Sequence, residues 1–216
     1  DYEYEDLINK FNIKNNNQYI ESTAFTYDPV NCQIVSSTKQ NTYLGRQESL
    51  NILPRLIYKY SHYNAFEAHL QAYILQNYKS PHLYNLLSML PNEPLWIGNE
   101  VACGVGMQKI DIMIKQENEK EIYIRLIELK DEAPYDNIVL HQIPWYLEWL
   151  SNYVLPRYNN KIIHVIPTII ANGNLSEATK QCYENFSFNI INTKVEPLQY
   201  IGFDINNEEI NFTRFL

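Results

Sequence analysis

Two apolar segments that carry charges constrain the fold of this chain most strongly. Segments 110–114 (IDIMI) and 122–130 (IYIRLIELK) are rich in β-branched residues, and a polar connection separates them. They predict two strands of a hairpin. Because side chains alternate along a strand, Glu128 and Lys130 share one face, and Asp111 can reach that face from the neighbouring strand.

The charges in these apolar strands need a chemical reason, since burying an unpaired charge is costly. Asp111 and Glu128 are two carboxylates that would converge beside the ammonium of Lys130. Carboxylate oxygens are ligands for hard divalent cations, and the ammonium is left to meet an anion. The hairpin therefore predicts a cation site next to an anion site.

The pattern Asp…Glu-X-Lys on a hairpin resembles the PD-(D/E)XK nuclease superfamily, and within it the RecB-like nucleases and the catalytic domain of the archaeal NucS-type endonucleases. The resemblance implies an α/β (α+β) fold with a restriction-endonuclease-like core, in which helices flank a mixed central β-sheet. It implies Mg²⁺, or Mn²⁺ as a substitute, held by Asp111, Glu128 and the main-chain carbonyl of Leu129. Lys130 would orient or activate a water, or stabilise charge on the scissile phosphate.

A helix is expected over 64–78, where apolar residues follow helical spacing and Asn64 is the expected N-cap. Its F-E-x-x-L-Q-x-Y-I pattern resembles the helix that precedes the core sheet in these nucleases and carries a metal-binding acid. The resemblance implies that role for Glu67. The alternative is a first-turn carboxylate favoured by the helix dipole. Glu100, at the end of a strand predicted over 95–101, is either an accessory carboxylate or a surface residue.

A second helix is expected from about 137 to 150 and carries Gln142 and Tyr146 four residues apart, hence on one face. Q-x-x-x-Y after an E-x-K strand is the second signature of RecB-like nucleases. The resemblance implies that both residues bind substrate, since an amide and a phenol can hydrogen-bond phosphate or base edges. The alternative is a core Tyr beside a surface Gln. Pro144 could bend this helix.

The apolar segment 161–171 (KIIHVIPTIIA) predicts a central strand. It should run parallel to the strand 122–130, because a helix separates the two. His164 within it is expected to be buried and hydrogen-bonded. Further elements are expected downstream: a helix over 176–186, opened by Asn174 or Ser176, and short strands over 190–192 and 200–215, which would close the edge of the sheet.

The 216 residues suit one domain with a small appendage. Residues 1–50, rich in Thr, Ser, Tyr and Asn, predict a β-leaning N-terminal appendage of unknown role, and 51–216 predict the nuclease-like domain. The resemblance covers about 64–192. Within the appendage, three residues could contact a nucleic acid or serve only as surface and packing residues: Tyr43, Arg46 and Gln47.

Composition narrows the class of protein. A hydrophobic content of 45% suits a globular chain, and without an apolar run of eighteen residues no membrane span is expected. The acidic first residues resemble neither a secretory signal nor a mitochondrial presequence. Three scattered cysteines favour reduced thiols in a cytoplasm and exclude the clustered-Cys iron–sulfur site of some RecB-like nucleases.

The net charge of −8 is the main observation against a nucleic-acid partner, because phosphate binding favours a basic surface. A carboxylate cluster that a metal neutralises would account for part of this charge. The remaining acidic residues would have to lie away from the cleft.

Taken together, the residues and the resemblance predict a Mg²⁺-dependent deoxyribonuclease, more specifically an endonuclease. It would hydrolyse DNA phosphodiester bonds in repair and processing or in restriction. A restriction enzyme of this length would act as a homodimer across a palindrome. Two alternatives stay open. The chain could be a catalytically silent nuclease-fold subunit that binds nucleic acid or supports a larger complex, or an ordinary α/β domain whose Glu-Leu-Lys ends a strand by coincidence.

Overall fold

The computed structural model describes residues 25–28, 33–36, 51–62, 65–91, 95–104, 108–132, 135–158, 160–206 and 209–216. The chain divides into two units, Asp1–Asn51 and Ile52–Leu216. In the first unit, strand β1 (Phe25–Asp28) pairs antiparallel with β2 (Gln33–Ser36). Tyr43, Arg46, Gln47 and the expected cap Asn64 lie outside the described residues.

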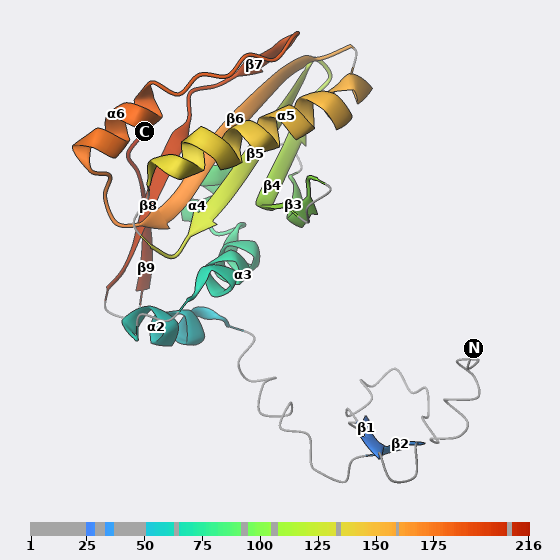
Figure 1. Ribbon diagram of the computed structural model, residues 1–216, viewed down its shortest axis with the longest axis vertical. Helices are drawn as coiled ribbons and strands as arrows, with labels where there is room; N and C mark the ends of the chain where they lie inside the picture. Colours follow the sequence, from blue (N-terminus) through green and yellow to red (C-terminus); the bar gives the residue numbers. More distant parts are fainter. Residues whose placement is uncertain are drawn as a thin grey trace. The chain divides into compact units, whose positions relative to one another are not determined.

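The second unit is built on a seven-stranded mixed sheet in the order β3-β4-β5-β6-β8-β9, and β7 pairs with β6 (Figure 1). The strands are β3 (Trp96–Ala102), β4 (Lys109–Glu117), β5 (Glu121–Lys130), β6 (Ile162–Asn172), β7 (Thr193–Val195), β8 (Gln199–Asn206) and β9 (Glu209–Arg214). β4 and β5 form the predicted antiparallel hairpin, and β6 runs parallel to β5 as predicted. The mixed α/β class is confirmed.

Helices cover both faces of this sheet, so each face has its own core. The helices are α2 (Leu53–Ser61), α3 (Glu67–Asn77), α4 (Pro81–Leu87), α5 (Ile143–Tyr153) and α6 (Glu177–Glu184). Side chains of α5 and α6 pack with one face, and those of α2, α3 and α4 pack with the other (Figure 1). Alternation along β5 divides its residues between the cores: Leu126 faces α5, and Ile127 faces α3.

Helix boundaries differ from the predictions at two places. α3 begins at Glu67, and Phe66 occupies its N-cap position. The helix expected over 137–150 begins with a π-helical turn, Ile138–Gln142, and continues as α5. Pro144 lies in the first turn of α5, directly after the π-helical turn. Because proline has no N–H, it cannot donate to a carbonyl of that turn, so the π-helical turn lies where the helical hydrogen-bond ladder lacks a donor. The helix changes from π to α just before this proline and continues past it to Tyr153.

One of the C-terminal strands also differs from the prediction. The strand expected over 190–192 lies instead at Thr193–Val195, and Ile190 forms only an isolated bridge. Strands β8 and β9 form the predicted strands over 200–215, and β9 is the edge strand that closes this side of the sheet, as predicted. Ser176 caps α6, as predicted: its hydroxyl accepts a hydrogen bond from the backbone N–H of Thr179 at 3.1 Å.

Two further predictions concern buried polar groups. His164 is buried, and its Nδ1 lies 2.8 Å from Glu196, which confirms a buried, hydrogen-bonded histidine. Cys103 is buried and Cys182 is half-buried, and neither is in a disulfide. Cys32 lies outside the described residues. Among the described helices, none combines the length and apolar character needed to cross a bilayer.

Candidate functional site

The site begins where the β4–β5 hairpin opens. The paired register runs from Glu117 opposite Ile122 to Ile112 opposite Ile127. One residue further, Asp111 Oδ2 accepts a hydrogen bond from the backbone N–H of Leu129 at 2.7 Å. If the two strands stayed paired, the Leu129 N–H would donate to a main-chain carbonyl of β4. Here the side chain of Asp111 accepts this hydrogen bond instead. This bond holds the Asp111 carboxylate at the point where the strands part.

Glu128, on the adjacent strand, is held by three donors. Its Oε1 accepts hydrogen bonds from Lys130 Nζ (2.6 Å) and Gln142 Nε2 (2.9 Å). Its Oε2 accepts a hydrogen bond from the hydroxyl of Tyr146 at 2.7 Å. With only 3% of its side chain exposed, this carboxylate depends on these bonds for its orientation.

The spacing of Gln142 and Tyr146 does bring both side chains to one place, and each bonds a different oxygen of Glu128. Tyr146 is only 4% exposed, and its hydroxyl also lies 3.0 Å from the carbonyl of Lys109. Both residues therefore position Glu128 in this structure. Their predicted contacts with substrate stay a prediction.

Glu67 reaches the same site from the first turn of α3. Its Oε1 lies 3.9 Å from the ammonium of Lys130, which is also bonded to Glu128. A cavity of about 300 Å³ opens beside these groups. It is lined by Ala65, Glu67, Ala68, Gln71, Glu100, Asp111, Leu129 and Asp131. Helix α3 and the hairpin thus bring together the acidic residues that are far apart in the sequence.

Gln71 links the two acidic strands and is a site residue that the sequence reasoning missed. Its Nε2 donates to the main-chain carbonyl of Asp111 (2.7 Å) and to Glu100 Oε1 (3.2 Å). Gln71 is one helical turn after Glu67, so the shared helix face was the signal that could have found it. Glu100 lines the cavity, pairs with Lys109 at 2.7 Å, and has a φ of 52°, which is uncommon for a residue with a side chain.

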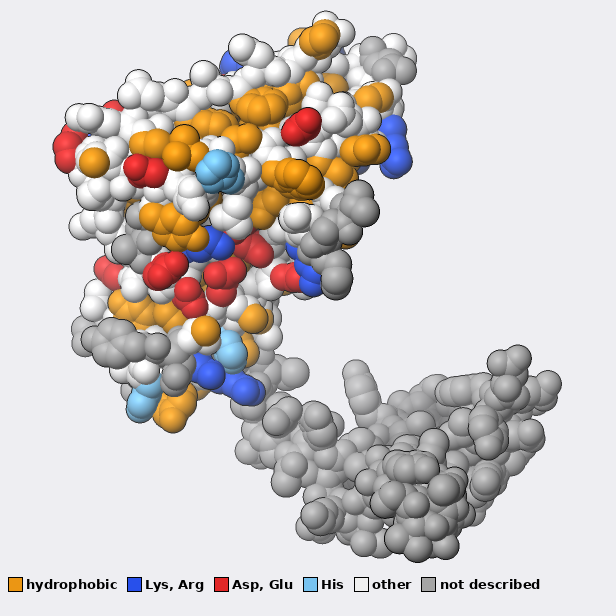
Figure 2. Space-filling model, viewed as in Figure 1, with side chains coloured by type: hydrophobic (Ala, Val, Ile, Leu, Met, Phe, Trp, Pro, Cys, Tyr) orange, Lys and Arg blue, Asp and Glu red, His pale blue; other side chains and the backbone are white. Residues whose placement is uncertain are grey.

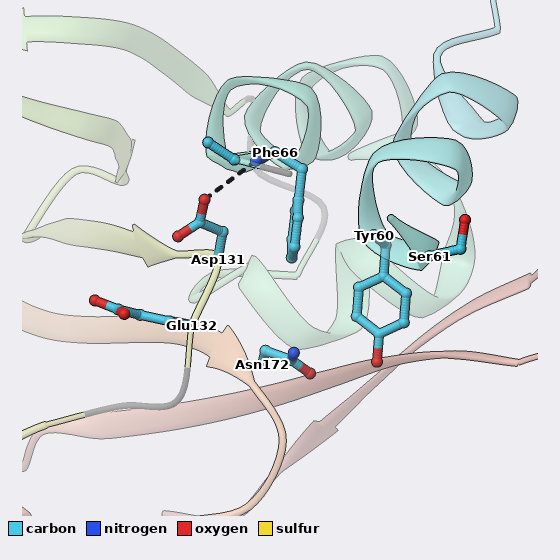
Figure 3. A pocket seen from close by; sticks show the side chains of 7 residues that line it. Tyr60, Ser61, Phe66, Asp131, Glu132 and Asn172 are labelled. Atoms are coloured by element: carbon cyan, nitrogen blue, oxygen red, sulfur yellow. Dashed lines mark hydrogen bonds between the residues drawn. The ribbon is translucent and has the colours of Figure 1, made fainter. Parts of the chain in front are cut away.

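Asp131, the residue after β5, joins the hairpin to α3. Its Oδ2 accepts a hydrogen bond from the backbone N–H of Phe66 at 3.1 Å, as Figure 3 shows. A second cavity of about 470 Å³ lies on this side, with walls that include Tyr60, Phe66, Glu132 and Asn172. Asp131 therefore anchors the start of the helix that carries Glu67. The sequence reasoning did not single out Asp131, although its position directly after the E-x-K strand could have indicated that it lies near the site.

Negative charge exceeds positive charge in this site. Burial, and then the charge of Glu128, raise the pKa of the Asp111 carboxyl to about 7. Burial also raises the pKa of Glu67, although Lys130 opposes that change. Burial acts to lower the pKa of Lys130, but Glu128, Glu67 and Asp111 together outweigh it and the pKa is raised. Figure 2 shows Asp and Glu side chains gathered in one band across this face.

A metal ion at this site would meet carboxylate oxygens that already accept hydrogen bonds. Among the described residues, no three His, Cys, Asp or Glu side chains are grouped so that they could hold a metal ion. The two oxygens of Glu128 accept hydrogen bonds from Lys130, Gln142 and Tyr146. Mg²⁺ needs fewer protein ligands, because it binds through one or two carboxylates and keeps several waters. The buried carboxylate of Asp111 beside Glu128 fits such an ion, whose charge would offset their repulsion.

Compared with protein-family models, curated proteins and solved structures, the chain has no match. Its function is therefore inferred from the geometry of the site. That geometry joins a carboxylate-rich cavity, one protonated amine and two neutral donors.

Proposed function

We propose that the unit Ile52–Leu216 is a Mg²⁺-dependent deoxyribonuclease with a restriction-endonuclease-like core. It would act as an endonuclease of the PD-(D/E)XK type that hydrolyses DNA phosphodiester bonds in repair and processing or in restriction. One observation carries the proposal: Asp111, Glu128 and Lys130 meet at the open end of a hairpin. Glu67 joins them from the preceding helix, and Gln142 and Tyr146 join them from the following helix.

Asp111 and Glu128, with the carbonyl of Leu129, would hold the metal, and Glu67 lies at the edge of the same cavity. Bound Mg²⁺ supplies Lewis acidity and makes a coordinated water a better nucleophile. The bond from the Leu129 amide keeps one oxygen of Asp111 in place. Tyr146 and Gln142 keep Glu128 from turning away. The protein thereby arranges its ligands before substrate arrives.

Lys130 has a defined chemical role in this proposal. Its ammonium lies between Glu128 and Glu67, and its pKa is raised, so it is protonated at neutral pH. A protonated amine cannot accept a proton from water. Lys130 therefore stabilises negative charge that develops on the scissile phosphate, and it does not act as the general base.

The acidic net charge is compatible with DNA because some cations are concentrated on one helix. Arg55 and Lys59 are four residues apart on α2, and among the described residues neither forms an ion pair. Figure 2 shows Lys and Arg side chains at the α2 end of the face that carries the acidic band, and others elsewhere on that face. Such cations can contact the phosphate backbone beyond the metal site, where counterion release favours binding.

The deciding experiment incubates the full chain with supercoiled, linear, single-stranded and branched DNA. We expect cleavage with Mg²⁺ or Mn²⁺, none with EDTA, and none by Asp111→Ala. Cleavage that persists in Asp111→Ala would contradict the site. If wild-type protein cuts none of these DNAs in either metal, the nuclease proposal is wrong.

A second function has one observation in its favour. The described residues contain no ready three-ligand metal cluster, which suits a nuclease-fold subunit that binds nucleic acid or supports a complex without cutting. The same assay separates the two. DNA binding that is equal with and without EDTA, and no cleavage, would support the silent subunit.

A further inference from the structure

A half-exposed tryptophan lies beside the proposed catalytic residues. Trp145, on α5, is 45% exposed, and its indole Nε1 donates to the carbonyl of Cys103 at 3.0 Å. The ring also packs against Gly104, since a Cβ there would come within 3.1 Å of its Cζ2. The polar edge of the indole is therefore satisfied and its position is fixed, while much of its surface stays in contact with solvent.

Trp145 forms part of a cavity of about 290 Å³. The lining residues are Gln108, Lys109, His141, Gln142, Trp145 and Tyr146. Two of them, Gln142 and Tyr146, hold Glu128, so this cavity adjoins the proposed metal site. Its volume lies below the roughly 300–1,000 Å³ of cavities that hold drug-sized ligands, and suits a single ring system.

The chemistry of this cavity differs from that of the cavity at Asp111. Among its described lining residues none is acidic, whereas Glu67, Glu100, Asp111 and Asp131 all line the other. The one cation here, Lys109, is paired with Glu100 on an exposed surface, where ion pairs contribute little and exchange partners easily. Sites for single-stranded nucleic acid combine an aromatic ring, on which a base can stack, with positive charge near the phosphates. Trp145 and Lys109 supply these two features here, and the amide and imidazole groups add hydrogen-bonding atoms.

We propose that Trp145 stacks on the base of an unpaired nucleotide next to the scissile phosphate, so that the substrate is single-stranded or locally unpaired DNA. The inference rests on the proposed nuclease function. An unpaired base offers its flat face to an indole whatever its sequence. A base within a duplex is already stacked, and extruding it costs free energy. Lys109 and His141 lie where they can contact the adjoining phosphate or the base edge.

The test measures binding apart from cleavage. In the non-cleaving Asp111→Asn background, a short labelled single strand and a closed hairpin duplex are titrated with each protein. Trp145→Ala should weaken single-strand binding by about ten- to hundredfold, the loss typical of one stacked base, and should leave duplex binding unchanged. Trp145→Phe keeps a ring and should lose much less.

Trp96→Ala is the matched control. Trp96 is 49% exposed on β3 and lies opposite Lys115, away from the open end of the hairpin. Its replacement should change neither affinity. Should Trp145→Ala fail to fold, a fluorescent adenine analogue in the single strand decides. The emission of this analogue should be quenched when the strand binds the Asp111→Asn protein. The quenching should be weaker when it binds the double variant that also carries Trp145→Phe.

The outcomes separate this inference from the proposed function. Equal single-strand affinity in Trp145→Ala, a loss equal for both DNAs, or an unquenched analogue overturns the stacking role even if wild-type protein cuts DNA. Absence of cleavage by wild-type protein overturns the nuclease proposal itself, and the stacking proposal fails with it. A loss confined to the single strand, with cleavage by the wild type, supports both.

Discussion

Strand β5 carries two buried charges only three positions apart, and their hydrogen-bond partners and neighbouring charges differ. Arg125, 2% exposed, donates to three neutral acceptors: the carbonyl of Leu87, the hydroxyl of Thr168 and the amide oxygen of Gln199. Glu128 is equally buried, but it neighbours the like charges of Asp111 and Glu67.

Arg125 is a structural charge, whereas Glu128 and Asp111 belong to the proposed catalytic site. At Arg125 the donors are satisfied and the bonds tie α4 and two strands together. At the end of the strand, burial and then the charge of Glu128 raise the pKa of Asp111, and the charged form of this carboxylate lowers the stability of the folded state. Proteins tolerate such unfavourable charge mainly where chemistry needs it. Breaking each cluster should therefore have opposite consequences for stability and activity.

The largest effect is expected for Asp111→Asn. If Asp111 holds Mg²⁺ as proposed, its loss should lower the cleavage rate by on the order of a thousandfold or more. Because the substitution also removes like-charge repulsion, Tm should rise by a few degrees near neutral pH. Cleavage assays and thermal unfolding measure the two effects. Asp204→Asn, an exposed position on β8, is the control and should change neither. An inactive variant with a lowered Tm would show that Asp111 is mainly structural.

Arg125→Met should do the reverse. The change leaves the three acceptors of the guanidinium without their donor, so the free energy of unfolding should fall by about 2–4 kcal/mol. The cleavage rate per folded molecule should stay within about twofold at low temperature. Urea denaturation and active-fraction assays test this. Arg157→Met, at an exposed arginine, should leave the midpoint nearly unchanged. Loss of activity in a fully folded Arg125→Met protein would show that Arg125 is not only structural.

Tyr146→Phe separates a positioning role from substrate binding. Removing the hydroxyl frees one oxygen of Glu128, and such changes next to a metal ligand typically cost about 10–100-fold in metal affinity or activity. The Mg²⁺ concentration for half-maximal cleavage should rise, and the KM for DNA should change little. Tyr183→Phe, which removes a buried hydroxyl bonded to the carbonyl of Tyr135, is the matched control. A raised KM with an unchanged Mg²⁺ requirement would instead favour the substrate contact predicted from Q-x-x-x-Y.

The smallest effect is the pH dependence of stability. The pKa of Asp111 is raised from 3.8 to about 7 on folding, so between these values the folded state binds more protons than the unfolded state. Stability should therefore fall as pH rises through this window, and Asp111→Asn should flatten the slope. Added Mg²⁺, which favours the charged carboxylate, should raise Tm more at about pH 8 than at about pH 5. A Tm that rises with pH in the wild type and not in Asp111→Asn would contradict the raised pKa of Asp111 in the folded state.

Much of the fold could be predicted from the sequence because it depends on local patterns of residues. Alternation along 122–130 placed Glu128 and Lys130 on one face, and their 2.6 Å bond confirms it. A helix between two apolar strands predicted that β5 and β6 are parallel. Local signals could have placed Gln71 and Asp131 near the site, but not their hydrogen bonds, because their partners, Asp111 and Phe66, are distant in the sequence. No local period reports such contacts.

The amino-acid sequence by itself determined which residues share a strand or helix face, because those relations follow from the repeat of the backbone. Tertiary structure decided which faces meet. Helix packing on both sides of the sheet brought Glu67 and Tyr146 to one end of the hairpin. Gln142, the last residue of the π-helical turn, bonds Glu128 at the same place. Burial at that meeting point also raised the pKa of Asp111, since desolvation depends on everything packed around a carboxylate.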